Sequence, residues 1–136
     1  MFRYPVIIKL HETDAAGLLF FSQQFKLVHD AYEALLEKWG FGFAVLIREK
    51  DYFLPIVHAE SDYKHPLFVG DRVNIDVTVA DVGTTSFTFT YKLTLNDGTL
   101  VGTAQTVHVT MDKKTQTKIP LPSDLRRAVA GTAEIL

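Results

Sequence analysis

The stretch of sequence from which the fold can be worked out reads TDAAGLLFF and occupies residues 13–21. It places a carboxylate, Asp14, among small turn-forming residues and continues at once into an apolar segment. Asp is a common turn and capping residue, so its presence alone indicates little. The segment that follows is, however, too apolar for an exposed loop, and we expect Asp14 to lie against a hydrophobic surface. A carboxylate in such surroundings is a candidate general base or nucleophile.

A long amphipathic helix is predicted directly after this stretch. Its apolar stripe at helical spacing consists of Phe25, Val28, Tyr32, Leu35, Leu36 and Trp39. Ser22 is the predicted N-cap, and Gly40 lies where helices commonly end with a left-handed residue. Residues 41–50 keep a helical pattern, as a bent or separate turn. Because the stripe is broad, the helix must pack against a large apolar surface.

Strands are predicted on both sides of this helical region. A β-branched run precedes it at 6–10, and the extended or alternating segments that follow it are 54–63, 73–79, 87–95 and 100–111. Residues 87–95 give the strongest signal, since large apolar side chains alternate there with Thr88, Thr90, Lys92 and Thr94. The second face of this strand is therefore expected to be wet. A final short helix should follow Pro122, with Ser123 as its N-cap.

One long helix and about five antiparallel strands combine most simply as a two-layer α+β fold, with a curved sheet wrapping the helix. Residues 1–136 are expected to form a single domain, because that length suits one core and no linker or repeat interrupts it. Only one face of the sheet can be covered by the helix. Long strands with exposed edges also favour pairing with a second copy, so we expect a homo-oligomer.

The composition excludes several classes of function. The formal net charge is -2 without any basic block, which argues against nucleic acid as a partner. The chain has no cysteine, so disulfides and thiolate metal sites are excluded, and a reducing cytoplasm is the expected location. No signal peptide is apparent, and no apolar run approaches the roughly 20 residues that span a bilayer. No cofactor-binding motif was found, and we expect none.

Asp14 has two interpretations from the residues alone. It could simply cap local N–H groups in its turn, which is the commoner role for such a residue. It could instead face a substrate held at the start of the long helix, where unpaired N–H groups favour a developing oxyanion. Glu12 is the rival acid and is expected to be a solvated loop residue. A metal site built on His11 and Asp14 lacks further ligands at a suitable spacing.

The histidines and aromatics near this stretch allow further alternatives. His58 lies in the apolar sequence at 55–59, either as a satisfied strand residue or projecting into the same pocket as Asp14. His29 is expected to pack on the long helix, and no partner is indicated for His65 or His108. Phe20, like its neighbour Phe21, would be core or the wall of an acyl or aromatic pocket, and the two roles are compatible.

The motif at 14–21 resembles that of the hotdog-fold thioesterases of the 4-hydroxybenzoyl-CoA thioesterase family. The family pattern is an aspartate, two small residues or a proline, a glycine, two aliphatic residues and two aromatic ones, followed by a long helix and four strands. The resemblance covers nearly the whole chain. It implies that Asp14 is the catalytic nucleophile or general base and that Gly17 allows a tight turn at the pocket. It also implies that the backbone N–H of Phe21 polarises the thioester carbonyl.

The same resemblance implies an acyl-CoA substrate and an active site between the subunits of a dimer, with dimers commonly pairing into tetramers. Within the family, the segments 53–59, 69–72 and 104–109 look most like the 1,4-dihydroxy-2-naphthoyl-CoA thioesterases of phylloquinone and menaquinone synthesis. There, His58 would lie close to the aromatic acyl group. The relatives linked to the Tol-Pal system carry a histidine after the motif aromatic, whereas this chain has Ser22.

One departure from the family leaves the substrate carrier open. The arginine cluster that binds nucleotide phosphates in the 4-hydroxybenzoyl-CoA enzyme is replaced by GTTS at 83–86, so an acyl-carrier-protein substrate remains an alternative. Short- or medium-chain acyl-CoA thioesters are alternative substrates. A hydratase that pairs His29 or His58 with Asp14 is a different enzyme class on the same fold. A non-enzymatic acyl-CoA-binding module is a third alternative.

Overall fold

The computed structural model describes the backbone of residues 1–135 and the side chains of residues 1–131. A short 3-10 turn, η1, lies at Leu10–Glu12. The helices are α1 (Gln23–Lys38), α2 (Phe43–Glu49) and α3 (Ser123–Ile135). The strands are β1 (Phe2–Ile7), β2 (Tyr52–Phe53), β3 (Ile56–Tyr63), β4 (Arg72–Val82), β5 (Ser86–Leu95), β6 (Leu100–Val109) and β7 (Met111–Asp112). None of the described helices is long and apolar enough to cross a membrane.

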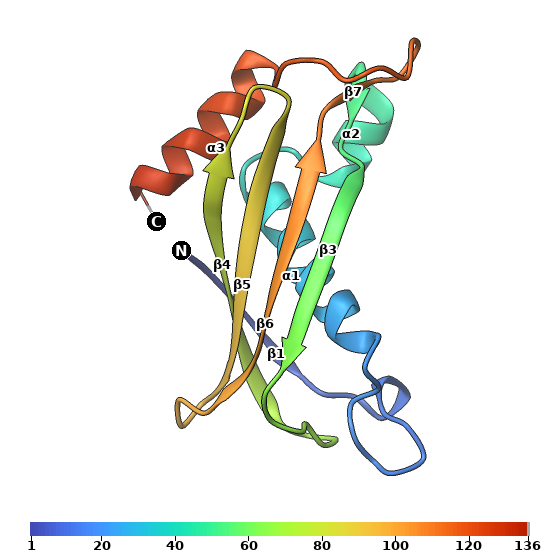
Figure 1. The fold of residues 1–136 in the computed structure, drawn as a ribbon, viewed down its shortest axis with the longest axis vertical. Helices are drawn as coiled ribbons and strands as arrows, with labels where there is room; N and C mark the ends of the chain where they lie inside the picture. Colours follow the sequence, from blue (N-terminus) through green and yellow to red (C-terminus); the bar gives the residue numbers. More distant parts are fainter. Residues whose placement is uncertain (136) are drawn as a thin grey trace.

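A five-stranded antiparallel sheet with the order β1-β4-β5-β6-β3 forms one layer of the molecule. The helix α1 lies across one face of this sheet, and α3 packs beside β4 (Figure 1). The short strands β2 and β7 pair separately, next to α2. A long helix against a curved antiparallel sheet is the predicted α+β hotdog arrangement, and the prediction is confirmed.

The core lies between α1 and the sheet, as the apolar stripe of α1 predicts. Leu27, Leu35 and Leu36 are fully buried, and they face a sheet surface that includes the fully buried Phe87 and Phe89. Burying large aliphatic and aromatic side chains contributes roughly 1.5–3 kcal/mol each, so this interface is a major source of stability.

The residues predicted to begin and end α1 are Ser22 and Gly40. Gly40 follows the helix with φ +87°, the left-handed conformation predicted for it. Ser22 precedes the helix, but its side chain makes no capping hydrogen bond and its backbone is already helical, with φ -69° and ψ -22°. The N-cap position predicted for Ser22 is therefore confirmed, but Ser22 does not cap through its side chain, because a capping side chain reaches the first N–H groups from an extended backbone. Ser123 likewise lies inside α3, as its first residue.

The first strand differs from its prediction at 6–10. β1 instead spans Phe2–Ile7 and contains Pro5, while Ile8 leaves the strand and is buried. Proline is tolerated there because β1 is an edge strand, where a missing N–H need not break a hydrogen bond. The prediction of a strand over 87–95 is confirmed by β5.

The other edge of the sheet is β3, and it is unusually exposed. Every β3 side chain is exposed except Ser61, which is half-buried. Ile56 and Val57 are among the exposed residues, although both are large and apolar. An edge strand with apolar side chains and no proline is a surface on which another strand can pair.

Candidate active site

The loop that carries Asp14 is a tight, hydrogen-bonded turn between η1 and α1. The Asp14 N–H donates to the Leu18 carbonyl oxygen at 2.8 Å, and the Gly17 N–H donates to the Asp14 carbonyl oxygen at 3.0 Å. Gly17 adopts φ +78°, in the left-handed region that glycine enters without steric cost. The backbone therefore reverses at Gly17, and this conformation fixes the position of Asp14 relative to the start of α1.

The two oxygens of the Asp14 carboxylate have different environments. Oδ1 accepts hydrogen bonds from the N–H groups of Ala16 at 2.9 Å and Leu18 at 3.3 Å. Oδ2 has no hydrogen-bond partner among the described residues. Asp14 thus does cap its own turn, as the simpler interpretation predicted, and it keeps one oxygen free. Capping and chemistry do not exclude each other here, because each uses a different oxygen.

The surroundings of Asp14 in a single chain are not those predicted. The side chain is exposed, and so are Phe20, at 43%, and Phe21, at 63%. The hydrophobic surface expected beside Asp14 is not formed by the described residues of a single chain. The two aromatic rings contact each other, with their centroids 4.9 Å apart, and project from the loop.

Phe21 lies just before α1, and its two backbone groups differ in their hydrogen bonding. Its N–H donates to no acceptor in the part of the chain that the structure describes, whereas its carbonyl oxygen accepts a hydrogen bond from the Tyr63 hydroxyl. Groups at a helix start lack intrahelical acceptors, and the positive end of the helix dipole lies there. The free N–H of Phe21 can therefore bind a negatively polarised oxygen.

The first turn of α1 is tied to the sheet by Gln24, a residue that the sequence analysis did not single out. Its side-chain amide donates to Ser61 Oγ at 2.6 Å and to the Asp62 carbonyl oxygen at 3.1 Å. Gln24 is buried, and a Cβ at Gly102 would approach its amide to 2.8 Å. The sequence signal was a polar residue beside the apolar stripe of the helix. This anchor holds the α1 start against β3.

A cavity of about 330 Å³ lies beside the Asp14 loop. It is bordered by Leu18, Phe21 and Gln24 on one side and by Tyr63 and His65 on the other. The cavity therefore adjoins Phe21, the residue that carries the free N–H. His65, for which the sequence indicated no partner, bonds through Nδ1 to the Pro66 carbonyl oxygen at 2.7 Å.

The histidines that were considered as partners of Asp14 lie elsewhere in the chain. His58 is exposed on β3, and its Nε2 is 3.5 Å from Glu60 Oε2. It precedes Tyr63 by five positions, or roughly 16 Å along an extended strand. His29 Nδ1 lies 3.0 Å from Glu33 Oε1, and the ring stacks on Phe43. One chain therefore does not bring either histidine to Asp14.

Glu12 is buried rather than solvated, so the prediction for this residue is wrong. Its side chain is 3% exposed, and Oε1 accepts the Lys9 N–H at 2.8 Å. Oε2 lies 3.4 Å from Lys26 Nζ on α1. Glu12 therefore joins η1 to α1 as a structural acid, and both of its oxygens have partners, unlike those of Asp14.

Tyr91, Thr106 and His108 form a buried series of hydrogen bonds in the core. The Tyr91 hydroxyl is 2.8 Å from Thr106 Oγ1, which is 2.7 Å from His108 Nε2. Burial lowers the pKa of His108 to about 3, with a smaller effect from the nearby His29, so this imidazole is neutral at neutral pH. Burial also raises the pKa of Tyr91 well above its usual value. His108, for which no partner was predicted, is thus a structural group.

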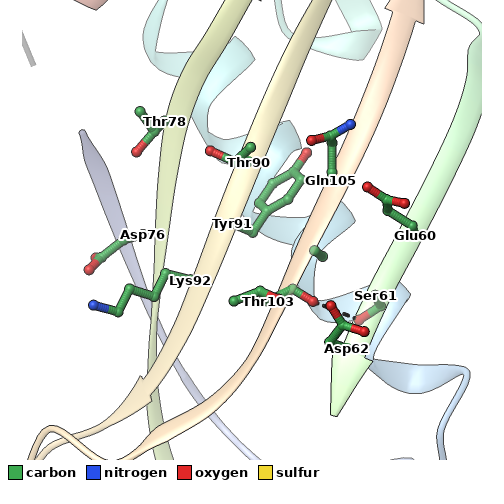
Figure 2. Close-up of a pocket in the computed structure, with 11 residues that line it drawn as sticks. Glu60, Ser61, Asp62, Asp76, Thr78, Thr90, Tyr91, Lys92, Thr103 and Gln105 are labelled. Atoms are coloured by element: carbon green, nitrogen blue, oxygen red, sulfur yellow. Dashed lines mark hydrogen bonds between the residues drawn. The ribbon is translucent and has the colours of Figure 1, made fainter. Parts of the chain in front are cut away.

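Figure 2 shows a separate cavity, of about 370 Å³, on the face of the sheet away from α1. Its lining is polar and includes Thr90, Lys92 and Gln105, which confirms that the outer face of the 87–95 strand is wet. It does not include any residue of the Asp14 loop. Among the described residues, no three His, Asp or Glu side chains gather in a way that could hold a metal ion.

Comparisons with known proteins identify the family of the chain. A model of the thioesterase-like superfamily matches residues 8–129. A 1,4-dihydroxy-2-naphthoyl-CoA hydrolase of Rippkaea orientalis is 36% identical over 131 residues, which cover 95% of both chains. The solved structure of a 1,4-dihydroxy-2-naphthoyl-CoA thioesterase from Synechocystis has a TM-score of 0.89 at 31% identity, covering 95% of both chains.

A gentisyl-coenzyme A thioesterase structure is also similar, with a TM-score of 0.82 at 28% identity, covering 94% of this chain and 98% of that one. These matches confirm the resemblance that the sequence suggested. The family match over residues 8–129 includes the Asp14 loop, α1 and the strands β3, β4, β5 and β6 of the main sheet. The chain belongs to the thioesterase-like superfamily.

Proposed function

We propose that the protein hydrolyses an aromatic acyl-CoA thioester, with 1,4-dihydroxy-2-naphthoyl-CoA as the preferred substrate. The observation that carries the proposal is the joint presence of a carboxylate oxygen without a partner, on Asp14, and a backbone N–H without a partner, on Phe21. Both belong to one short loop next to a cavity. The relatives named for naphthoyl-CoA hydrolysis support the choice of acyl group.

The chemistry asked of these groups is acyl transfer to water. In one route, Asp14 takes a proton from a water molecule, whose oxygen attacks the thioester carbonyl carbon. In the other, Asp14 itself attacks, and water then hydrolyses the resulting anhydride. In both routes the carbonyl oxygen gains negative charge, which the Phe21 N–H stabilises, and the C–S bond breaks to release CoA as a thiolate. Gly17 supports either route by holding the turn.

A second copy of the chain completes the proposed site. Phe20 and Phe21 are too apolar to remain exposed beside a catalytic carboxylate, and β3 offers Ile56 and Val57 at an open edge. Antiparallel pairing of two β3 strands about their centre would put the partner subunit's His58 opposite Ser61. That position lies near the Tyr63 end of β3, so the partner subunit's His58 could contact the acyl group. We propose a dimer on this basis, and a dimer of dimers by the family resemblance.

A thiol-release assay tests the proposed function. The panel would contain 1,4-dihydroxy-2-naphthoyl-CoA, benzoyl-CoA, butyryl-CoA and octanoyl-CoA, with the same acyl groups on acyl carrier protein as a second set. We expect the highest kcat/KM for the naphthoyl-CoA thioester. Higher activity on aliphatic or carrier-protein thioesters would contradict the substrate, and binding without thiol release would contradict an enzyme.

Two further measurements separate the remaining alternatives. A hydratase would add water to an enoyl-CoA without releasing thiol, which loss of enoyl absorbance reports. Sedimentation equilibrium reports the assembly, and we expect a dimer or tetramer at the enzyme concentrations used for assay. A fully active monomer would contradict a site shared between two copies.

A further inference from the structure

Gln24, the buried glutamine in the first turn of α1, has its amide orientation fixed by the groups around it. Its Nε2 donates to Ser61 Oγ at 2.6 Å and to the Asp62 carbonyl oxygen at 3.1 Å. The Ser61 hydroxyl gives its own hydrogen to the Thr103 carbonyl oxygen at 3.0 Å (Figure 2), so Ser61 Oγ can only accept from Gln24. Both partners therefore require the nitrogen of the amide, and both hydrogens on Nε2 are used.

The amide oxygen of Gln24 is left without a donor. Oε1 accepts no hydrogen bond from any described residue. In the described part of the chain, the buried side-chain atoms that are both unpaired and sealed from solvent are the hydroxyls of Tyr32 and Tyr52 and Nδ1 of His108. Oε1 is not among them, although Gln24 as a whole is only 1% exposed. It therefore faces the cavity of about 330 Å³ that Gln24 borders beside Phe21.

Close packing at Gly102 of β6 holds the amide in this orientation. A Cβ at Gly102 would lie 2.5 Å from the Asp62 carbonyl oxygen, 2.8 Å from Gln24 Nε2 and 3.3 Å from Gln24 Oε1. The side chain of Gln24 thus lies directly against the β6 backbone, and turning Oε1 away from the cavity would break both bonds of Nε2. The free oxygen is therefore held in a fixed position.

The cavity brings this acceptor beside the proposed reacting groups. Leu18, whose N–H bonds to Asp14 Oδ1 at 3.3 Å, borders the cavity together with Phe21 and Gln24. Gln24 follows Phe21 by three residues, or roughly 4.5 Å along a helix axis. An amide oxygen without a donor, a carboxylate oxygen without a donor and a backbone N–H without an acceptor therefore lie within residues 14–24, beside one cavity.

The reacting end of a thioester offers no hydrogen for Oε1 to accept. Its carbonyl oxygen and its sulfur are both acceptors, and the carbonyl oxygen is the partner proposed for the Phe21 N–H. The attacking water, by contrast, carries two hydrogens. An amide oxygen is too weak a base to take a proton, but it can accept a hydrogen bond from water and so orient it. The cavity has room for this molecule, because one water occupies only about 30 Å³.

We propose that Gln24 is a catalytic residue that holds the attacking water, with Oε1 accepting one of its hydrogens and the free oxygen of Asp14 receiving the other. The proposal rests on the proposed function and adds a residue to that site. With Asp14 as base, the water oxygen bonds to the acyl carbon, its proton goes to Asp14, and the C–S bond breaks with its electron pair left on sulfur. In the anhydride route, the same water attacks the acyl carbon, and its proton goes to the departing Asp14 carboxylate.

Hydroxylamine, added as a competing acyl acceptor, tests the proposal, because it is a strong nucleophile whose attack does not require an orienting group. Water yields the carboxylic acid and hydroxylamine yields the hydroxamate, while both acceptors need the same oxyanion stabilisation. On the best thioester of the panel, we expect Gln24→Met to lower kcat for hydrolysis about 10²-fold and to change KM less than about 3-fold. The ratio of hydroxamate to acid should rise at least about 10-fold.

Two variants separate the water site from the anchor to β3. Ser61→Ala removes one anchor of the amide and leaves Oε1 in place, so it should lower kcat about 5-fold without changing the product ratio. Gln24→Glu is the conservative variant. Burial favours its neutral acid, whose carbonyl oxygen still accepts from water, so its product ratio should stay close to that of the wild type. Gln24→Leu replaces Gln24→Met if that protein does not fold.

The outcomes that contradict the proposal differ from those that contradict the function. A wild-type product ratio in a folded Gln24→Met or Gln24→Leu protein would overturn the proposal, and so would a raised ratio in Gln24→Glu. A raised KM with unchanged kcat would also overturn it and would make Oε1 an acceptor for an amide N–H of the pantetheine arm. All three results leave the proposed function standing. Absence of thiol release from every thioester by the wild-type protein would overturn both.

Discussion

The Tyr63 hydroxyl donates a hydrogen bond to the carbonyl oxygen of Phe21, which joins the last residue of β3 to the turn before α1. With the Gln24 anchor to Ser61 and Asp62, this bond fixes the start of the helix relative to the sheet edge. The Phe21 N–H belongs to the adjoining peptide group. Its direction therefore depends on contacts made by β3, the strand on which a second copy would pair.

Removing the Tyr63 hydroxyl should loosen the turn without unfolding the chain. We expect Tyr63→Phe to lower kcat about 5-fold, because one hydrogen bond of roughly 1 kcal/mol no longer holds the Phe21 peptide. KM should change little. Steady-state kinetics on the naphthoyl-CoA thioester measure the effect, and thermal unfolding serves as the control. A kcat equal to that of the wild type would show that the bond does not position the site.

The proposed oxyanion donor can be removed without changing a side chain. Replacing Phe21 by the corresponding α-hydroxy acid converts its amide to an ester, which deletes the N–H and keeps the ring, and weakens the Phe20 carbonyl that accepts the Gln23 N–H. We expect kcat to fall about 10²–10³-fold, as for other single oxyanion-hole donors. Phe21→Ala keeps the N–H and is the matched comparison, with a smaller loss in kcat. An ester protein with kcat close to that of the wild type, beside a large loss in Phe21→Ala, would mean that the ring, and not the N–H, matters.

Glu12 and Asp14 are two residues apart, yet they should respond to substitution in opposite ways. Glu12→Ala leaves the Lys9 N–H without its acceptor and should cost about 1–3 kcal/mol of unfolding free energy. Glu12→Gln keeps an acceptor oxygen and should cost less, with activity within about 3-fold of wild type. Urea denaturation and the thiol assay measure both. A large loss of activity in a stably folded Glu12→Gln protein would reopen Glu12 as the catalytic acid.

His108 should make the protein less stable in acid. Because its pKa is about 3 when folded, against 6.5 for an unperturbed histidine, the unfolded chain binds a proton between these values and the folded chain does not. The free energy of unfolding therefore falls as the pH drops below about 6.5, by about 1.4 kcal/mol per pH unit. Between pH 7 and pH 5, wild type should lose about 2 kcal/mol more than His108→Gln. Equal losses would contradict a buried neutral His108.

The helix and the central strands could be predicted because their sequence periodicity reflects which side chains are buried. α1 has one apolar face, and the residues of β5 alternate between core and outer positions. The pattern therefore predicts that one face of the helix packs against one face of the sheet. β1 was misplaced because Pro5 normally interrupts a strand, and only its place at the sheet edge makes it acceptable.

The site was less predictable from sequence because its contacts join distant segments. Burial of Glu12 depends on Lys26, and the polar chain at His108 depends on Tyr91 in a neighbouring strand. The sequence shows that the loop at Asp14 is apolar, but it does not show whether the same chain or a second copy covers that loop. A single chain leaves Asp14 exposed. The roles of the site residues, the single domain and the cytoplasmic location stay predictions.

The central claim is that Asp14 acts through the oxygen that its own turn leaves free. Asp14→Asn tests it most directly, because an amide oxygen can still accept the Ala16 and Leu18 N–H groups while the second position loses its basicity and charge. We expect the oligomer and the unfolding free energy to stay close to wild type and kcat for the naphthoyl-CoA thioester to fall at least about 10³-fold. A folded Asp14→Asn protein with activity within a few-fold of wild type would contradict the account.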